Sequence, residues 1–222
     1  MAETAVDQQS EVEQAGFAES SLPSVVYVID DDADVRDSLC WLIESVGKRV
    51  EAFETADAFL SRTQVGAMAG CVVADLRLPG MSGLEMVEAL TERGVALPVI
   101  MITGHGDVSA AVRAFKNGCI DFIEKPFSDK VLLERIDRAI QLDRQHRRQQ
   151  GQVASIRDRM ATLTTRETQV MSMVVVGKLN KQIAAELNLS HKTVEVHRSH
   201  VMSKMQAASL AELVRMAAAV GQ

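Results

Sequence analysis

The sequence predicts two folded parts of different class: an α/β part with a parallel sheet, followed by an all-α part of four short helices. Three observations support this. The chain has 222 residues, which favours two modest domains over one. Five short apolar runs alternate with amphipathic segments between about residues 25 and 142. After residue 158, helical segments with capping residues follow one another, as in a small helical domain.

The composition is that of an ordinary globular protein. Hydrophobic residues make up 47% of the chain and charged residues 24%, which argues against wholesale disorder. We find neither a run of 18 apolar residues nor a basic N-terminal segment, so the sequence predicts no membrane span and no secretory signal, and we expect a cytosolic protein. The odd number of cysteines, without CxxC spacing, indicates buried thiols rather than disulfides or a zinc site: Cys40, Cys71 and Cys119.

Charge is distributed unevenly along the chain. Residues 1–24 contain five acids and no bases, and we interpret them as a flexible acidic tail. Residues 155–222 contain nine bases and five acids, a net charge of +4, although the whole chain has a net charge of -6. An acidic module joined to a basic one is compatible with a nucleic-acid partner for the basic end, but a solvated basic surface explains the charge equally well.

The α/β part consists of five strand-helix units. The strands are expected at Val25–Ile29, Arg49–Phe53, Cys71–Ala74, Pro98–Ile102 and Asp121–Ile123. Helical spacing is found near residues 33–46, 55–62, 84–91, 107–117 and 128–141. Five such units in about 118 residues predict a parallel sheet covered by helices on both faces.

Polar side chains follow four of these strands at the same end of the sheet, where open α/β sheets bind ligands. They are Asp30 to Asp32, Asp75, Thr103 and Lys125. Carboxylates gathered in one crevice repel one another unless a hard cation lies between them, and Mg²⁺ is the obvious candidate. A carboxylate there can also accept a phosphoryl group, with a metal and a lysine neutralising its charge; Asp75 and Lys125 fit these roles. The Thr103 hydroxyl could donate to a phosphoryl oxygen.

Each of these residues also has an ordinary structural explanation. Asp32 or Asp34 could cap the following helix, Asp75 could be a turn residue before Pro79, and Lys125 could be a solvated loop lysine. Four independent coincidences at one sheet end favour the functional interpretation.

Four strings in this part, VYVIDDDADVR, VVADLRLPGMSG, MITGHGD and DFIEKPF, resemble the receiver domain of bacterial two-component response regulators. The resemblance covers residues 25–142 and implies a flavodoxin-like (βα)5 fold. It implies that Asp75 is the phosphoacceptor, that Asp30 and Asp31 are the acidic pair, and that Thr103 and Phe122 are the switch residues. Mg²⁺ would be bound by the carboxylates of Asp30, Asp31 and Asp75 and by the Arg77 carbonyl. Lys125 would contact the phosphate, and Lys125–Pro126 would be a cis peptide. The role of Asp32 stays open.

Residues 143–157 are expected to form a linker. Apolar positions are sparse there, and Gly151 interrupts what could otherwise be one continuous helix. We interpret the segment as a hinged linker helix, and a solvated connector is the alternative.

The basic part, residues 158–222, has the pattern of a helix-turn-helix module. Thr164 and Glu167 form a capping box before an apolar segment that ends at Gly177, a second helix covers Lys181 to Leu187, and Ser190 caps a third from His191 to Met205. Ser209 and Glu212 form another box for the last helix. A tight turn between the second and third helices is typical of this motif.

The third helix has two distinct faces. Val194, Val201 and Met205 share one side, which must pack on other helices. The opposite side contains one apolar residue, Val196, which suits a thymine methyl in the major groove or is an incidental surface residue. That side also contains Lys192, Glu195, Ser199 and Ser203. His197 is expected to be a partly buried packing residue rather than a metal ligand, because no second ligand has suitable spacing.

The string from Leu163 to Met205 resembles the LuxR-type DNA-binding domain, and with the receiver ahead of it the architecture is similar to the NarL/FixJ group. This implies a base-reading surface of Lys192, Glu195, Val196 and Ser199, with four residues nearer the DNA backbone: Asn180, Lys181, Arg198 and Lys204. For Asn180 and Lys181, a helix N-terminus that favours phosphate supports the same role.

The sequence therefore predicts a transcription regulator that a histidine kinase activates by Mg²⁺-dependent phosphorylation of Asp75, and that then dimerises through its receiver and binds promoter DNA. RNA polymerase is left open as a further partner, and neither enzymatic turnover nor membrane association is expected. Two alternatives are a regulator controlled by protein contact without phosphate, and an aspartyl-phosphate phosphatase acting on small molecules.

Overall fold

The computed structural model describes residues 22–104 and 118–221, and these form two compact units that divide between His146 and Arg147. The expected acidic tail lies largely outside the described residues, as does the helix expected at 107–117. Among the described helices, none is long and apolar enough to cross a membrane.

The first unit contains a five-stranded sheet in which all strands are parallel, in the order β2-β1-β3-β4-β5. The strands are β1 (Val25–Ile29), β2 (Arg49–Phe53), β3 (Gly70–Asp75), β4 (Val99–Thr103) and β5 (Asp121–Glu124). The helices between them are α1 (Ala33–Ser45), α2 (Ala56–Arg62) and α3 (Gly83–Glu92), and α5 (Asp129–Ala161) follows the last strand. The predicted α/β class is confirmed, with strand ends shifted by about one residue.

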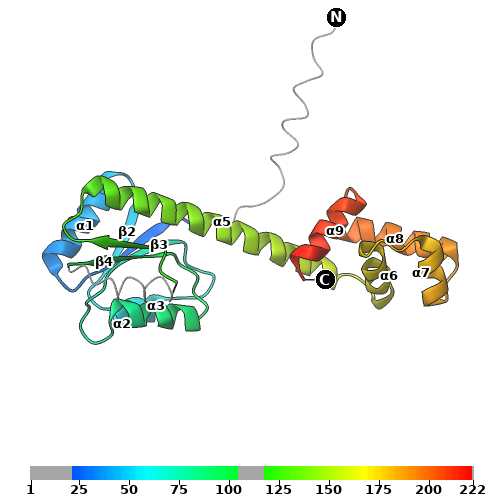
Figure 1. Ribbon diagram of the computed structural model, residues 1–222, viewed down its shortest axis with the longest axis horizontal. Coiled ribbons are helices and arrows are strands. Elements are labelled where there is room, and N and C mark those ends of the chain that lie inside the picture. The colour runs from blue at the N-terminus through cyan, green and yellow to red at the C-terminus, as the bar shows by residue number, and fades with distance from the viewer. Residues whose placement is uncertain (1–21, 105–117, 222) are drawn as a thin grey trace, which may run out of the picture. The chain divides into compact units, whose positions relative to one another are not determined.

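Helices cover both faces of this sheet (Figure 1). Val26, Val28 and their neighbours on one face pack with α1 and α5, while Tyr27 and Ile29 on the other face pack with α2 and α3. This alternation follows from the two-residue period of a strand, which sends successive side chains to opposite faces. Both faces are apolar because helices bury both of them.

The start of β3 lies against β1 so closely that only glycine fits. Gly70 has a φ of +124°, and a Cβ added there would lie 1.9 Å from the Val25 carbonyl oxygen. The Gly70 N–H donates to the carboxylate of Asp143 at 2.9 Å. Asp143 is buried on α5, so this hydrogen bond joins the helix to the edge of the core.

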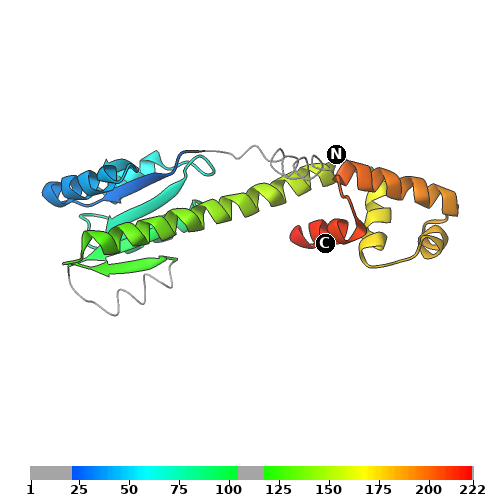
Figure 2. The ribbon, with the colours of Figure 1, turned by 90° about the horizontal axis from the view of Figure 1, so that it is seen from above.

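The helix α5 continues without a break through Gly151 to Ala161, as Figure 2 shows. The expectation that Gly151 interrupts it is therefore wrong. A single glycine costs a helix interior only about 1 kcal/mol relative to alanine, and helical neighbours on both sides outweigh that cost.

The second unit is an all-α domain, as predicted. Its helices are α6 (Thr165–Val175), α7 (Asn180–Leu187), α8 (His191–Met205) and α9 (Leu210–Ala219). The Thr164–Glu167 capping box is present in both directions. At α9, Ser209 accepts from the Glu212 N–H, but the Glu212 carboxylate accepts from the N–H of Ala208, so the second expected box is only half formed. The core includes Val170, Ile183, Val194, Val201 and Leu213, contributed by all four helices.

Candidate functional site

The predicted polar residues of the first unit meet where the strands end. Asp75 and Thr103 are the last residues of β3 and β4, while Asp30 and Lys125 directly follow β1 and β5. In the sheet register, Ile29 pairs with Ala74 and Asp75 with Ile102, which brings these ends level. The parallel topology therefore gathers residues that are up to 95 positions apart in the sequence.

Lys125 joins the two carboxylates of this group. Its Nζ donates to Asp75 Oδ2 at 2.7 Å and to Asp30 Oδ2 at 3.1 Å. Asp30 is 2% exposed, whereas the Asp75 side chain keeps 13% of its surface accessible. Of the two acids, Asp75 is thus the one that a reactant can reach.

The environment shifts the pKa of two of these groups. Burial raises the pKa of Asp30 above its usual range, against the opposing effects of the Lys125 hydrogen bond and charge. Burial also works against the charged form of Lys125, but the hydrogen bonds to Asp75 and Asp30 outweigh it and raise the pKa of Lys125. Lys125 is therefore a permanent cation at neutral pH.

The three consecutive aspartates after β1 differ in their surroundings. Asp30 points inward, and its Oδ1 accepts from the Asp32 N–H at 3.0 Å. Asp32 caps α1, because its Oδ1 accepts from the N–H groups of Asp34 and Val35. Asp31 is exposed beside the cluster. The open question about Asp32 is thus answered by the helix cap.

The remaining predicted residues line the same strand ends. The Arg77 N–H donates to Asp75 Oδ1 at 2.8 Å, which places the Arg77 backbone beside the acceptor carboxylate. Thr103 is buried, and its carbonyl accepts from the Lys125 N–H at 2.7 Å. Phe122 is half-buried against the core, and the Lys125–Pro126 peptide is cis, as expected.

The oxygen atoms of this cluster are suitable ligands for a hard cation. Carboxylates of Asp30, Asp31 and Asp75 and the carbonyl of Arg77 are all oxygen ligands, which Mg²⁺ prefers. Lys125 occupies one oxygen of two of these carboxylates, but each carboxylate oxygen has two lone pairs and can accept more than one partner.

The second candidate surface is the exposed face of α8. The turn before it contains Asn188 in the left-handed conformation with φ of 53°, and Ser190 caps the helix by accepting from the Thr193 N–H. Val194 and Val201 are buried, as predicted, while the Val196 side chain is 47% exposed. The other predicted base-reading residues on this face are exposed as well: Lys192, Glu195 and Ser199.

Three of the four predicted backbone-contacting residues already have partners inside the unit. Arg198 Nη1 donates to Asn180 Oδ1 at 2.7 Å, which links α8 to the start of α7. Lys204 Nζ donates to Glu167 Oε2 at 2.6 Å and to the Thr162 carbonyl at 3.1 Å. Lys181 is exposed at the start of α7.

Sequence reasoning missed a cluster between α6 and the flank of α8. His197 is half-buried as expected, but the argument that no second ligand has suitable spacing is wrong. Glu167 of α6 and His200 lie beside it, and one candidate ligand atom from each of the three lies within 4.8 Å of the others. The His200 spacing of three residues was visible in the sequence, whereas Glu167 is brought close only by helix packing.

Comparisons with known proteins agree with this architecture. Residues 26–137 match the response regulator receiver domain family, and residues 161–217 match the family of bacterial regulatory proteins of luxR type. Nodulation protein W of Bradyrhizobium diazoefficiens is 44% identical over 94% of this chain and 91% of its own length. Transcriptional regulatory protein FixJ of Azorhizobium caulinodans is 47% identical over 90% of this chain and 94% of its own length.

A solved structure extends the similarity to the fold. The response regulator StyR superposes with a TM-score of 0.80 at 40% identity, over 89% of this chain and 99% of that one. The chain therefore belongs to the two-component response regulators that combine a receiver domain with a LuxR-type DNA-binding domain.

Proposed function

We propose that this response regulator accepts a phosphoryl group on Asp75 from a histidine kinase, in a Mg²⁺-dependent reaction, and that phosphorylation promotes dimerisation and promoter binding. The observation that supports this most strongly is the double hydrogen bond of Lys125 to Asp75 and Asp30. It holds one accessible carboxylate next to a cation at the ligand-binding end of a parallel sheet.

In the transfer step, an Asp75 carboxylate oxygen attacks phosphorus. A P–O bond forms, the P–N bond to the kinase imidazole breaks, and the imidazole takes up a proton. Lys125 neutralises charge on the phosphoryl oxygens. Asp30, Asp31, Asp75 and the Arg77 carbonyl would hold the magnesium ion, which supplies further positive charge to the transferred group when it is bound.

The signal would leave the site through Thr103 and Phe122. Thr103 and Asp75 end adjacent strands, so the Thr103 hydroxyl would sense the new phosphoryl oxygens by donating a hydrogen bond to one of them. A shift of Thr103 then lets Phe122 on the neighbouring strand β5 change position. The changed face would promote dimerisation, and it consists of strand β5 and the fourth helix of the receiver, expected at residues 107–117, which lie outside the described residues.

On DNA, the α8 face would read bases with Lys192, Glu195, Val196 and Ser199. Asn180, Lys181, Arg198 and Lys204 would contact the phosphate backbone. Two linked copies in a dimer gain affinity for paired half-sites through effective concentration. We assign residues 25–142 to the receiver, 143–157 to the linker and 158–222 to DNA binding, and we propose no enzymatic turnover of small molecules.

The test compares the wild-type chain with Asp75→Asn in binding to a DNA fragment that the acetyl-phosphate-treated protein selects from a random library. Acetyl phosphate with Mg²⁺ should add one phosphoryl group by intact mass and tighten DNA binding only in the wild type. Asp57→Asn, at an exposed aspartate of α2, is the matched control and should respond normally.

Equal stimulation of Asp75→Asn would overturn the proposal. DNA binding without any phosphorylation of Asp75 would favour control by protein contact, and turnover of p-nitrophenyl phosphate would favour a phosphatase.

A further inference from the structure

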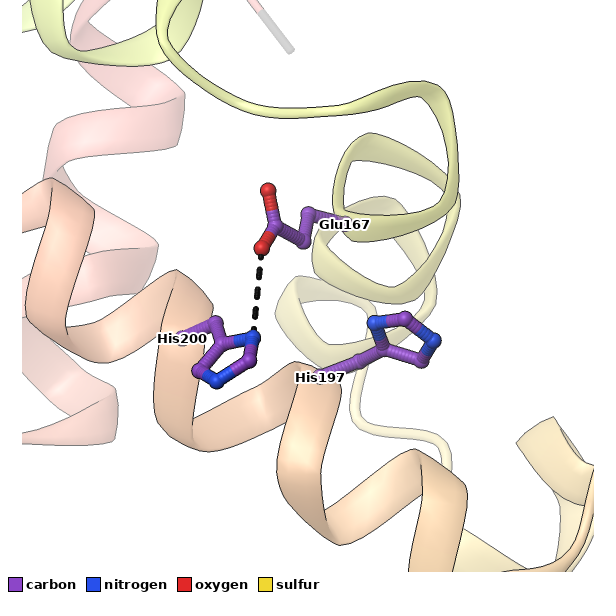
Figure 3. A group of neighbouring side chains, drawn as sticks. All are labelled: Glu167, His197 and His200. Atoms are coloured by element: carbon purple, nitrogen blue, oxygen red, sulfur yellow. Dashed lines mark ion pairs between the residues drawn. The ribbon is translucent and has the colours of Figure 1, made fainter.

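The cluster of Glu167, His197 and His200 lies apart from the proposed phosphorylation and base-reading residues. Both histidines project from α8 on the side that faces α6, and Glu167 reaches toward them from α6 (Figure 3). Residues three apart on a helix share a face, which explains why the two imidazoles are neighbours. Two imidazoles and one carboxylate are a ligand set typical of zinc sites with an open fourth position.

His197 has an unsatisfied nitrogen. Its Nδ1 is buried and has no hydrogen-bond partner among the residues that the structure describes. A buried polar atom without a partner is unfavourable, so such atoms call for a ligand, an ion or a bound water. A metal ion at this position would satisfy the ring.

The Glu167 carboxylate is held as an anion with one oxygen to spare. The Lys204 hydrogen bond, together with the Thr164 N–H, lowers the pKa of Glu167 to about 2. Both of these donors contact Oε2, whereas Oε1 faces His200 Nδ1 at 3.5 Å. The capping box and the Lys204 contact can therefore persist while Oε1 binds a metal.

The distances are short enough for a modest rearrangement to complete the site. Ligand atoms about 2.0–2.2 Å from a tetrahedral metal lie roughly 3.4 Å from one another. The three candidate atoms are within 4.8 Å, and His200 is exposed and free to change rotamer. The nearby Lys204 ammonium opposes a dication, so ligands with strong affinity are needed, which favours imidazole-binding metals over Mg²⁺.

We propose that Glu167, His197 and His200 form a binding site for a divalent transition-metal ion of the zinc class, with water as a fourth ligand. The ion would join α6 to α8, and so fix the helix that carries the proposed base-reading residues. Because Lys204 contacts Oε2, this lysine would stay in place when Oε1 binds the ion.

The experiment titrates Zn²⁺ into the full chain by calorimetry in buffer containing Mg²⁺, and compares variants that share the same receiver cluster, so that any Zn²⁺ bound there is common to all of them. The test variant is His200→Gln, since His200 is exposed and its replacement leaves the core intact. The control is His191→Gln, which removes a histidine of the same helix that pairs with Glu195 outside the cluster.

We expect wild type and His191→Gln to bind one Zn²⁺ ion at this site with similar affinity. His200→Gln should bind it at least about tenfold more weakly, because even the loss of a residue that only supports a metal ligand costs that much affinity. Zn²⁺ should raise the melting temperature of the wild type and of the control by about 4 °C or more at high occupancy, but not that of His200→Gln. Co²⁺ in place of Zn²⁺ should give the visible absorption of a tetrahedral ion in the same two proteins.

The proposal is overturned if His200→Gln binds Zn²⁺ as tightly as wild type, or if His191→Gln loses the ion as well. Neither outcome depends on phosphorylation, so the result is independent of the role assigned to Asp75.

Discussion

The strand-end cluster of the receiver and the exposed face of α8 are built in opposite ways. Asp30, Asp75 and Lys125 come from distant parts of the chain and are held together by the sheet, mostly away from water. Lys192, Val196 and Ser199 are near neighbours on one helix and stand in solvent. The proposed phosphorylation site would therefore depend on the geometry of a few atoms, whereas the proposed DNA surface would sum many weak contacts.

The largest effect on the free energy of unfolding is expected at Lys125, because it is the cationic partner of a buried carboxylate. Lys125→Met removes the partner of two carboxylates, one of them buried, and should lower the free energy of unfolding of the receiver by about 2 kcal/mol in Mg²⁺-free buffer. Saturating Mg²⁺ should restore most of this loss, because the dication takes over the role of the ammonium. Urea unfolding followed by Trp41 fluorescence measures it.

Lys48→Met is the matched control for that measurement. Lys48 pairs with Asp137 at 2.7 Å, but the Asp137 side chain is 58% exposed, so we expect a loss of about 0.5 kcal/mol or less, with no rescue by Mg²⁺. Equal losses in the two variants would contradict the contrast drawn between buried and exposed charges.

The DNA-binding domain also contains a buried carboxylate that is paired with a lysine, Glu167, and its contribution to stability should depend on pH. The pKa of Glu167 is lowered from 4.5 to about 2 in the folded state, by Lys204 and then by the Thr164 N–H. The ionised Glu167 carboxylate stabilises the fold fully above pH 4.5, which is the pKa of this group in the unfolded chain. The stabilisation is lost as the pH falls toward 2, the pKa in the folded state. We expect the wild type to lose about 2 kcal/mol over this range in metal-free buffer, and Glu167→Gln to have lost that amount already at pH 7.

Amide hydrogen exchange of peptides from α6 and α8 reports this loss locally. Glu195→Gln, at an exposed glutamate of α8, should change protection by about 0.5 kcal/mol or less at either pH. A wild-type domain whose protection is unchanged at pH 3 would show that Glu167 is no more important than a surface acid.

The elements that carry both sites could be predicted from the sequence. The strand ends were predicted to within about one residue, because alternation and apolar runs locate strands and the parallel topology then places Asp75 beside Lys125. The capping pattern located α8 from His191 to Met205, the bounds that the structure has.

What could not be predicted depends on contacts between elements. The pairing of Arg198 with Asn180, and the approach of Glu167 to His197 and Lys204, require the packing of three helices, which residue spacing does not encode. Gly151 shows the converse problem, because a local propensity was overridden by the helix around it.

An intermediate effect is expected at the DNA surface. Arg198→Ala should weaken DNA binding about tenfold, since one phosphate contact is lost. The slope of the logarithm of the binding constant against the logarithm of the salt concentration should fall in magnitude by roughly one. Fluorescence anisotropy across a salt series measures both quantities. Arg166→Ala removes an arginine of α6 outside the predicted surface, and should leave the slope unchanged.

If Arg198→Ala weakens binding without changing the slope, Arg198 acts by positioning Asn180 rather than by contacting phosphate. Asn180→Ala, which keeps the arginine but removes its hydrogen bond, should then reproduce the loss.

The smallest effect is expected at Asp32, the aspartate that caps α1 and is not one of the proposed Mg²⁺ ligands. Asp32→Ala removes the acceptor for the N–H groups of Asp34 and Val35 and should lower the receiver's unfolding free energy by about 1 kcal/mol. Because the Asp32 carboxylate is turned toward α1, the affinity for Mg²⁺ and the extent of phosphorylation by acetyl phosphate should stay within about threefold of wild type, which is about 0.7 kcal/mol. Asp31→Ala, the neighbouring substitution, should do the reverse: it leaves the cap intact but weakens Mg²⁺ binding. A loss of Mg²⁺ affinity in Asp32→Ala as large as in Asp31→Ala would place the third aspartate in the metal site and remove the distinction between scaffold and ligand at this strand end.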